Sequence, residues 1–310
     1  MFCSRCNSEA VIELKYSGES LCKSCFLKLF EGRVKKTLRS GKLLGNTDKT
    51  AVALSGGKDS MVTLYMLDKL SRKAPKSELI AVSIDQGVKG FQKKGLDIAE
   101  SVCSKLGVKH YVYSFREEFG VTLDEIIKRS RKLENPAPAC SYCGVLRRWL
   151  LNTKAGELGV TRIATGHNLD DEVQTGLMNF IRGDLDRMAR MGALVGVIKD
   201  KGFVPRIKPL RGCPENEVEL YARLRKLDFQ SMKCPHSTEA FRGTIRGMVD
   251  KLEINHPGSK FQILGSIDEL IQILRSRAKA GRINRCEICG SLTSGDLCKV
   301  CQIKRELDLG

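Results

Sequence analysis

The cysteines place the strongest constraint on how this 310-residue chain folds, because ten of the thirteen form five Cys-x-x-Cys pairs. Two pairs lie near each end of the chain. Their members are Cys3, Cys6, Cys22 and Cys25 at the start and Cys286, Cys289, Cys298 and Cys301 towards the end. Four thiolates in two such pairs are the usual ligands of a structural zinc ion, and in segments this short the metal supplies folding energy. We therefore predict two Zn²⁺ sites; redox-active pairs are the alternative.

The net charge is the second constraint. The chain has 53 Lys and Arg residues against 36 Asp and Glu residues, a surplus of +17. Such a surplus favours a polyanionic partner, either nucleic acid or an anionic membrane surface. The sequence shows no apolar run long enough to cross a bilayer and no signal peptide, and an odd number of cysteines argues against a disulfide framework. We expect a cytoplasmic protein that does not enter the membrane.

Between the two ends, strand-like apolar runs alternate with amphipathic helical stretches. The predicted strands are Thr50–Leu54, Glu78–Asp85, Tyr111–Phe115 and Arg162–Thr165, and the predicted helices include Gln92–Leu106 and Leu123–Leu133. This alternation predicts an α/β domain: a parallel sheet with helices on both faces and a ligand cleft beyond the carboxyl ends of its strands. We place this domain at residues 31–278, between zinc-binding domains at 1–30 and 279–310. The cleft would lie between Ser55–Ser60, Ser83–Asp85 and Gly166–Asp171.

The segment Ser55-Gly56-Gly57-Lys58-Asp59-Ser60 follows the first predicted strand and begins a helix. Two glycines let an anion approach the backbone amides, and the helix N-terminus adds the positive end of its dipole. The side chains of Ser55, Lys58 and Ser60 can bond phosphate oxygens. The segment does not match the Walker A pattern. It predicts a phosphate-binding loop, and a plain strand-to-helix turn is the alternative.

Three further cysteines lie in the predicted central domain in a pattern that spacing alone does not explain. Cys140 and Cys143 begin a predicted helix, where thiol pKa values are lowered, and Cys234 lies far along the chain before Pro235 and His236. An iron–sulfur cluster, a catalytic disulfide pair, a zinc site that includes His236 and inert buried thiols all remain possible. The last two cysteines, Cys103 and Cys213, are expected to be packing residues.

Three basic runs are expected to flank the cleft and to form a track for phosphates. They are Lys28–Lys42, a group from Lys128 to Lys154 that includes Arg147 and Arg148, and a group of Lys201, Arg206, Lys208 and Arg211. Aromatic residues make up only 6 % of the chain, which does not support a stacking platform for single strands. A folded RNA such as tRNA fits better, with the target base turned out of its stack.

The glycine-rich hexapeptide resembles the PP-loop of the N-type ATP pyrophosphatases. Four more segments extend the resemblance to the tRNA 2-thiolation enzymes of the TtuA/TtcA family. They are Cys140-x-x-Cys143-Gly144, Gly166–Glu172, Arg206–Leu210 and Cys234-Pro235. The terminal cysteines are similar to those of the TtuA branch, whose members make 2-thiouridine. The resemblance covers nearly the whole chain, from Cys3 to Cys301.

The resemblance implies cleavage of ATP between its α- and β-phosphates, with Mg²⁺ near Asp59. It implies an ATP site made of Ala53, Ser55, Gly56, Gly57, Lys58, Asp59, Ser60, Ile84 and Gly166. It also implies a 4Fe-4S cluster with one open iron on Cys140, Cys143 and Cys234. Its catalytic residues would be Asp59, Arg147 and Asp171, with Asp170 as the alternative to Asp171. Arg147 replaces a Lys of some relatives, and Arg can hold a phosphate but cannot act as a base.

The function implied is that of an ATP-dependent tRNA sulfurtransferase. It would adenylate the C2 oxygen of a tRNA uridine and replace that oxygen with sulfur. The implied partners are tRNA, ATP and a sulfur donor, either a ubiquitin-like protein with a C-terminal thiocarboxylate or free sulfide, and the implied assembly is a homodimer. A tRNA 2-thiocytidine synthetase and a non-catalytic zinc-ribbon RNA-binding protein are the alternatives.

Overall fold

The computed structural model describes residues 1–310 except 196–202, 238–239, 278–283 and 310. Within the described residues, a six-stranded sheet has the order β5-β4-β3-β6-β8-β7. The strands are β3 (Lys49–Ala53), β4 (Glu78–Asp85), β5 (Lys109–Ser114), β6 (Arg162–Ala164), β7 (Leu194–Val195) and β8 (Arg206–Ile207). All neighbouring pairs are parallel except β7 with β8, which is antiparallel. The expected α/β architecture is confirmed, with an antiparallel edge strand that was not expected.

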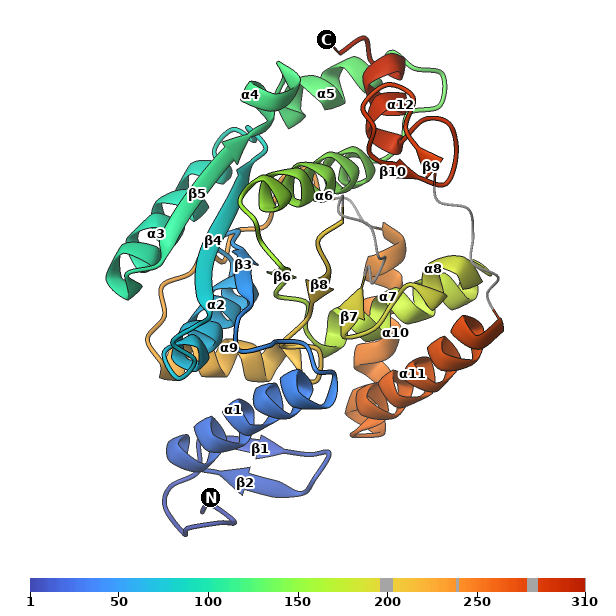
Figure 1. Ribbon diagram of the computed structural model, residues 1–310. Coiled ribbons are helices and arrows are strands. Elements are labelled where there is room, and N and C mark those ends of the chain that lie inside the picture. The colour runs from blue at the N-terminus through green and yellow to red at the C-terminus, as the bar shows by residue number, and fades with distance from the viewer. Residues whose placement is uncertain (196–202, 238–239, 278–283, 310) are drawn as a thin grey trace.

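Successive residues of β3 enter two different cores, because side chains alternate between the faces of a sheet. Val52 packs with helices α1 (Lys23–Ser40), α2 (Lys58–Ser71), α3 (Gln92–Leu106) and α9 (Glu215–Leu224). Ala51 packs with α4 (Phe115–Phe119), α5 (Leu123–Ser130), α6 (Ala139–Glu157) and α12 (Lys299–Glu306). Both faces of the sheet are therefore covered, as Figure 1 shows.

A separate group of helices packs beside the β7 edge of the sheet. It contains α7 (Leu169–Ile181), α8 (Leu185–Ala189), α10 (Ala240–Asn255) and α11 (Ser259–Arg277). These helices share two small apolar clusters, one around Leu169 and Val249 and the other around Met188 and Ile271. The N-terminus of α7 directly follows β6, so this group of helices carries one wall of the expected cleft.

Each end of the chain forms a small two-stranded unit that is anchored to the body. At the N-terminus β1 (Ile12–Leu14) pairs with β2 (Glu19–Leu21), and near the C-terminus β9 (Asn284–Arg285) pairs with β10 (Leu292–Thr293). The first unit continues into α1, so the expected boundary at residue 30 falls inside a helix. The two units lie at opposite ends of the molecule (Figure 1). No helix among the described residues is long and apolar enough to cross a membrane.

A hydrogen-bonded triad anchors the N-terminal unit. The Tyr16 hydroxyl donates to Glu217 Oε1 at 2.8 Å, and Arg33 donates both to Glu217 Oε2 and to the Tyr16 hydroxyl at 2.7 Å. The guanidinium of Arg33 also lies 5.5 Å from the ring centre of Phe261. These contacts join the N-terminal unit to α9 and α11, so side-chain contacts as well as the chain connection hold it to the rest of the protein.

Candidate functional site

The glycine-rich loop connects the carboxyl end of β3 to the N-terminus of α2. Gly56 has a φ of +79°, and a Cβ at this position would lie 2.3 Å from the backbone oxygen of Gly95 in α3. A Cβ on Gly166, after β6, would lie 2.7 Å from the backbone carbon of Asp59. Glycine is therefore required at positions 56 and 166, because three backbone segments meet there too closely for a side chain.

The two serines of the loop mainly shape it. Ser60 Oγ accepts from the backbone N–H of Ser55 at 3.2 Å and donates to the carbonyl of Gly57 at 2.9 Å. Ser55 Oγ lies 3.2 Å from Ser60 Oγ and accepts from the Gly57 N–H at 3.4 Å. The backbone of Gln230 donates to the carbonyl of Gly56 at 2.8 Å and fixes the loop from outside. Because Ser60 is buried, it is better placed to hold the loop than to bond a phosphate.

Lys58 and Asp59 begin a chain of polar contacts that joins the start of α2 to the starts of α9 and α7. Lys58 Nζ donates to Asp59 Oδ2 at 3.0 Å and to Glu215 Oε1 at 2.9 Å. Burial opposes the charge on Lys58, but these two carboxylates outweigh burial and raise its pKa. Asn168 Nδ2 donates to the other oxygen of Asp59 at 3.0 Å. Neither Asn168 nor Glu215 was assigned a role from the sequence, although Asn168 lies inside a quoted motif.

The two neighbouring aspartates at the start of α7 have different environments. Asp170 accepts from the Glu215 N–H at 2.7 Å and pairs with Lys260 Nζ at 2.5 Å, so it holds α7 against α9 and α11. Asp171 instead forms a reciprocal capping box with Asn168, whose side-chain amide also contacts Asp59. Burial raises the pKa of Asp171 to about 6, and the nearby Asp59 carboxylate adds to the effect. The geometry thus favours Asp171 over Asp170 for a chemical role.

Ala53 and Ile84, the residues expected near adenosine, lie at the carboxyl ends of β3 and β4. Ala53 is half-buried and Ile84 is buried. The carbonyl of Ile84 accepts from the side-chain amides of Gln86 and Gln92, at 2.7 and 3.2 Å. The adenosine side of the expected site is therefore made largely of backbone and apolar groups.

The three internal cysteines approach one another from two parts of the chain. Cys140 and Cys143 lie in the first turns of α6, and Cys143 and Cys234 pack against the same core. Cys140 Sγ is 3.7 Å from the carbonyl oxygen of His236, two residues after Cys234. Burial raises the pKa of Cys143, with Cys234 adding to the effect and Arg147 opposing it. Three half-buried thiols fit an iron–sulfur cluster, which binds each thiolate on a different iron.

Arg147 is an exposed residue of α6, one turn after Cys143. Its charge acts both on Cys143 and on His167, the residue before Asn168. Burial lowers the pKa of His167 to about 4, and Lys208 contributes, so the imidazole is neutral near pH 7. Its Nδ1 lies 2.8 Å from the Thr165 hydroxyl.

The terminal cysteines form two sets with the same local design. In each set the four Sγ atoms lie within 4.8 Å of one another and can hold a metal ion. Cys22 and Cys298 act as N-caps, and their sulfurs accept from the N–H groups of Cys25 and Cys301 at 3.5 and 3.4 Å. Four thiolates this close together repel one another, so all four can stay deprotonated only with a cation among them. Both sets fit the predicted Zn²⁺.

Cys103 and Cys213 are buried in the core that contains α1, α2 and α9. Burial raises their pKa values to about 11 and about 12. Both thiols are therefore protonated at neutral pH, as expected for packing residues.

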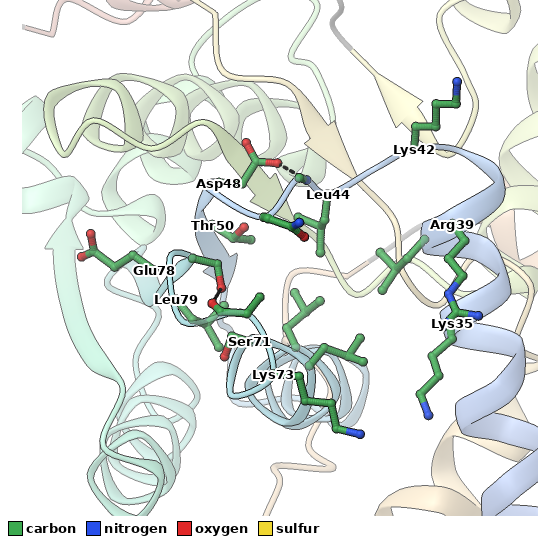
Figure 2. A pocket seen from close by; sticks show the side chains of 17 residues that line it. Lys35, Arg39, Lys42, Leu44, Asp48, Thr50, Ser71, Lys73, Glu78 and Leu79 are labelled. Atoms are coloured by element: carbon green, nitrogen blue, oxygen red, sulfur yellow. Dashed lines mark hydrogen bonds between the residues drawn. The ribbon is translucent and has the colours of Figure 1, made fainter.

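The first basic run does not flank the cleft, which corrects one sequence expectation. Lys35, Arg39 and Lys42 instead border a cavity of about 520 Å³ between α1, the end of α2 and the amino ends of β3 and β4 (Figure 2). The glycine-rich loop lies at the opposite, carboxyl ends of these strands. The spacing of apolar residues turns one face of α1 into the core, which leaves Lys35 and Arg39 beside this cavity, whereas Arg33 pairs with Glu217.

In the other two basic runs, some residues form ion pairs inside the fold and others line a cavity. Lys208 and Arg211 pair with Glu172 at 2.6 and 2.9 Å and so stabilise the start of α7. Lys128 and Arg131 line a second cavity, of about 430 Å³, together with His236. Lys201 lies outside the described residues.

Comparison with known proteins identifies the family. A model described as a PP-loop domain matches residues 27–252, and one described as the N-terminal LIM domain of 2-thiouridine synthetase TtuA matches residues 3–27. The tRNA 2-thiolation protein NcsA of Haloferax volcanii is 41 % identical over an alignment of 322 positions that covers 99 % of each chain. Cytoplasmic tRNA 2-thiolation protein 1 of Aspergillus niger is 34 % identical over 99 % of this chain and 88 % of that protein.

A solved structure agrees with the sequence matches. The U34-tRNA thiolase NcsA from Methanococcus maripaludis, determined with its 4Fe-4S cluster, superposes with a TM-score of 0.86 at 37 % identity. The match covers 99 % of this chain and 96 % of that one. The chain therefore belongs to the PP-loop family and, within it, to the tRNA 2-thiolation proteins.

Proposed function

We propose that this protein is an ATP-dependent tRNA sulfurtransferase that converts a uridine of tRNA to 2-thiouridine. The observation that carries the proposal is the hydrogen bond from the Gln230 N–H to the Gly56 carbonyl at 2.8 Å, since Gln230 lies four residues before Cys234 and holds that segment beside the glycine-rich loop. The predicted nucleotide-binding loop and a cysteine-bearing segment are thus held side by side. An enzyme that only hydrolyses ATP has no need of such thiols.

In the first reaction, the C2 oxygen of uracil attacks the α-phosphate of ATP and pyrophosphate leaves. The backbone amides of Gly56 and Gly57 and the N-terminus of α2 are placed to bind the departing phosphates. Asp59 is placed to bind Mg²⁺ on them, and Lys58 holds Asp59 in position. With a pKa of about 6, Asp171 is mostly ionised at pH 7 and can take the N3 proton of uracil, which makes the C2 oxygen a better nucleophile.

In the second reaction, sulfur attacks C2 of the adenylated base and AMP leaves with the former C2 oxygen. Cys140, Cys143 and Cys234 would hold a 4Fe-4S cluster, which when bound supplies one iron without a cysteine ligand where sulfur can bind. Arg147 would hold the phosphate of AMP, since a guanidinium binds phosphate with two parallel hydrogen bonds. His167 is neutral near pH 7 and therefore adds no further positive charge beside Arg147.

Several finer assignments belong to the same proposal. The names of the relatives support tRNA as the substrate and the cytoplasm as the location. We propose a ubiquitin-like protein thiocarboxylate or free sulfide as the sulfur donor and a homodimer as the assembly, with Zn²⁺ in both terminal cysteine sets.

The direct test is a reaction under anaerobic conditions with the iron-loaded protein, ATP, sulfide and tRNA that lacks 2-thio groups. Nucleoside mass spectrometry should show 2-thiouridine, with one AMP and one pyrophosphate formed for each thiolated base. Cys143→Ser should abolish the product, and the same change at the core residue Cys103 should not. Formation of 2-thiocytidine, or of ADP in place of AMP, would overturn the proposal.

A further inference from the structure

Two arginines beside the cysteine site have no acidic partner within the described parts of the chain. They are Arg148, on α6 next to Arg147, and Arg206, the first residue of β8. Neither forms an ion pair with a described carboxylate. Lys208 and Arg211, from the same segment as Arg206, both pair with Glu172. Glu172 therefore neutralises Lys208 and Arg211, whereas the charges of Arg148 and Arg206 are not neutralised by any described carboxylate.

Arg206 is held firmly from several sides. It is paired with Ile163 of β6 in the sheet register, and its Nη2 donates to the carbonyl of Arg148 at 3.2 Å. Its guanidinium lies 5.4 Å from the ring centre of Phe203. Nε is buried without a hydrogen-bond partner in the described structure, an arrangement that costs free energy unless a ligand supplies an acceptor.

Arg148 is directed towards the cysteine site by its own helix. An added Cβ at Gly144, one turn earlier, would lie 3.1 Å from a terminal nitrogen of Arg148, so glycine makes room for the guanidinium. This contact gives a physical reason for glycine after Cys143. The Arg148 side chain is exposed, so a ligand can reach it from solvent.

Electrostatics agree with this geometry. Burial and, to a smaller extent, the charge of Arg148 lower the pKa of Arg206 to about 10, and crowding by protein and the charge of Arg147 lower the pKa of Arg148. Arginine stays charged at neutral pH even so. Three adjacent positive charges repel one another, and an anion bound between them would offset that repulsion.

We propose that Arg148 and Arg206 form a receptor for one phosphodiester of the substrate RNA. The inference rests on the proposed function, because it takes tRNA as the polyanion. A guanidinium pair matches the two non-bridging oxygens of a phosphodiester. The phosphates of ATP have a separate site in the backbone amides of the glycine-rich loop after β3. Bound here, the RNA backbone passes beside Cys143 and Arg147, which places a turned-out base at the cleft.

The test measures binding of tRNA that lacks 2-thio groups to the metal-loaded protein at several salt concentrations, with ATP binding measured separately. Arg148→Gln and Arg206→Gln should each weaken tRNA binding about tenfold at low salt. Each should also reduce the slope of log affinity against log salt by about one, because one phosphate contact is lost. ATP affinity should stay within twofold of the unchanged protein. Arg223→Gln removes the same charge from an exposed site on α9 and should change neither quantity.

Arg148→Lys keeps the charge and should retain the salt slope while losing part of the affinity. If Arg206→Gln does not fold, Arg148→Gln decides the question alone, because its side chain is exposed. Weaker ATP binding with unchanged tRNA binding would assign the site to a nucleotide phosphate and overturn the proposal. An unchanged salt slope in an enzyme that still thiolates tRNA would overturn this inference and leave the function intact. A third outcome separates the two proposals. If the variants show the smaller salt slope but the unchanged protein binds tRNA without making 2-thiouridine, the phosphodiester site is supported and the proposed thiolation activity is refuted.

Discussion

Replacing Asp171 with asparagine should make the protein more stable at neutral pH while abolishing thiolation. The amide keeps an oxygen for the capping contact with the Asn168 N–H, which is 3.2 Å from the present carboxylate. The substitution removes the negative charge of Asp171, which burial and the nearby carboxylates of Asp59 and Glu215 destabilise. It also removes a weak attraction between Asp171 and Arg242, whose atoms are 3.9 Å apart.

The pKa of Asp171 sets the magnitude and the sign of the change in the free energy of unfolding that Asp171→Asn should cause. A rise from 3.8 to about 6 corresponds to about 3 kcal/mol. The Asp171 side chain is 31 % exposed, so solvent screens part of this, and we expect about 1–2 kcal/mol. Because the folded-state pKa is the higher one, the free energy of unfolding of the unchanged protein falls between about pH 4 and pH 6. The advantage of Asp171→Asn should therefore be near zero below pH 4 and complete above pH 6.

Urea denaturation at a series of pH values under anaerobic conditions measures this difference. The matched control is Asp170→Asn, one residue earlier. Asp170 is buried and pairs with Lys260, so neutralising it should destabilise the fold by about 3 kcal/mol at pH 7. A stability difference for Asp171→Asn that does not change with pH, or that is negative at pH 8, would refute the reasoning. Activity of the unchanged enzyme should rise as the pH increases through about 6, since Asp171 must be ionised to accept a proton.

Three further predictions concern the loop and the metals. Gly56→Ala should abolish ATP binding, measured by calorimetry, because the added Cβ would lie 2.3 Å from a backbone oxygen of α3. Gly57→Ala should be tolerated, because the atom nearest to its added Cβ belongs to a side chain and is 3.5 Å away. Cys143→Ser should lose the iron and visible absorbance of the anaerobic protein, and Cys103→Ser should lose neither; equal loss in both would contradict the ligand assignment. Cys22→Ala should reduce the zinc content from two ions to one per chain and lower the thermal midpoint, and an unchanged zinc content would show that this set does not bind zinc.

The sequence predicted the central elements well because their signals are local. Glu78–Asp85 forms β4 and Gln92–Leu106 forms α3 with the bounds expected from their apolar patterns. The strands β7 and β8 have two residues each, too few for any alternation to be read, so the antiparallel edge could not be predicted. The basic residues of Lys28–Lys42 were expected at the cleft, but Phe30 and Val34 on the opposite face of α1 decide its orientation.

The site was predicted only as far as its motifs extend. The glycine-rich loop and the cysteine pairs are recognisable because a few residues at fixed spacing carry the chemistry. Glu215 has no such signal, and its contact with Lys58 exists only because α9 packs against α2. The different roles of Asp170 and Asp171 were also beyond the sequence, since they depend on the position of Lys260, 90 residues away along the chain.

The packing of the C-terminal cysteine unit couples its predicted metal site to the internal cysteines. Cys298, Val300 and Cys301 share one core with Leu146 of α6, the helix that carries Cys140 and Cys143. A short unit with four cysteines takes folding energy from the metal that it binds. Removal of zinc from this unit should therefore loosen the support under α6. A chelator that extracts only zinc should lower the iron content that the protein retains, although it touches no iron ligand.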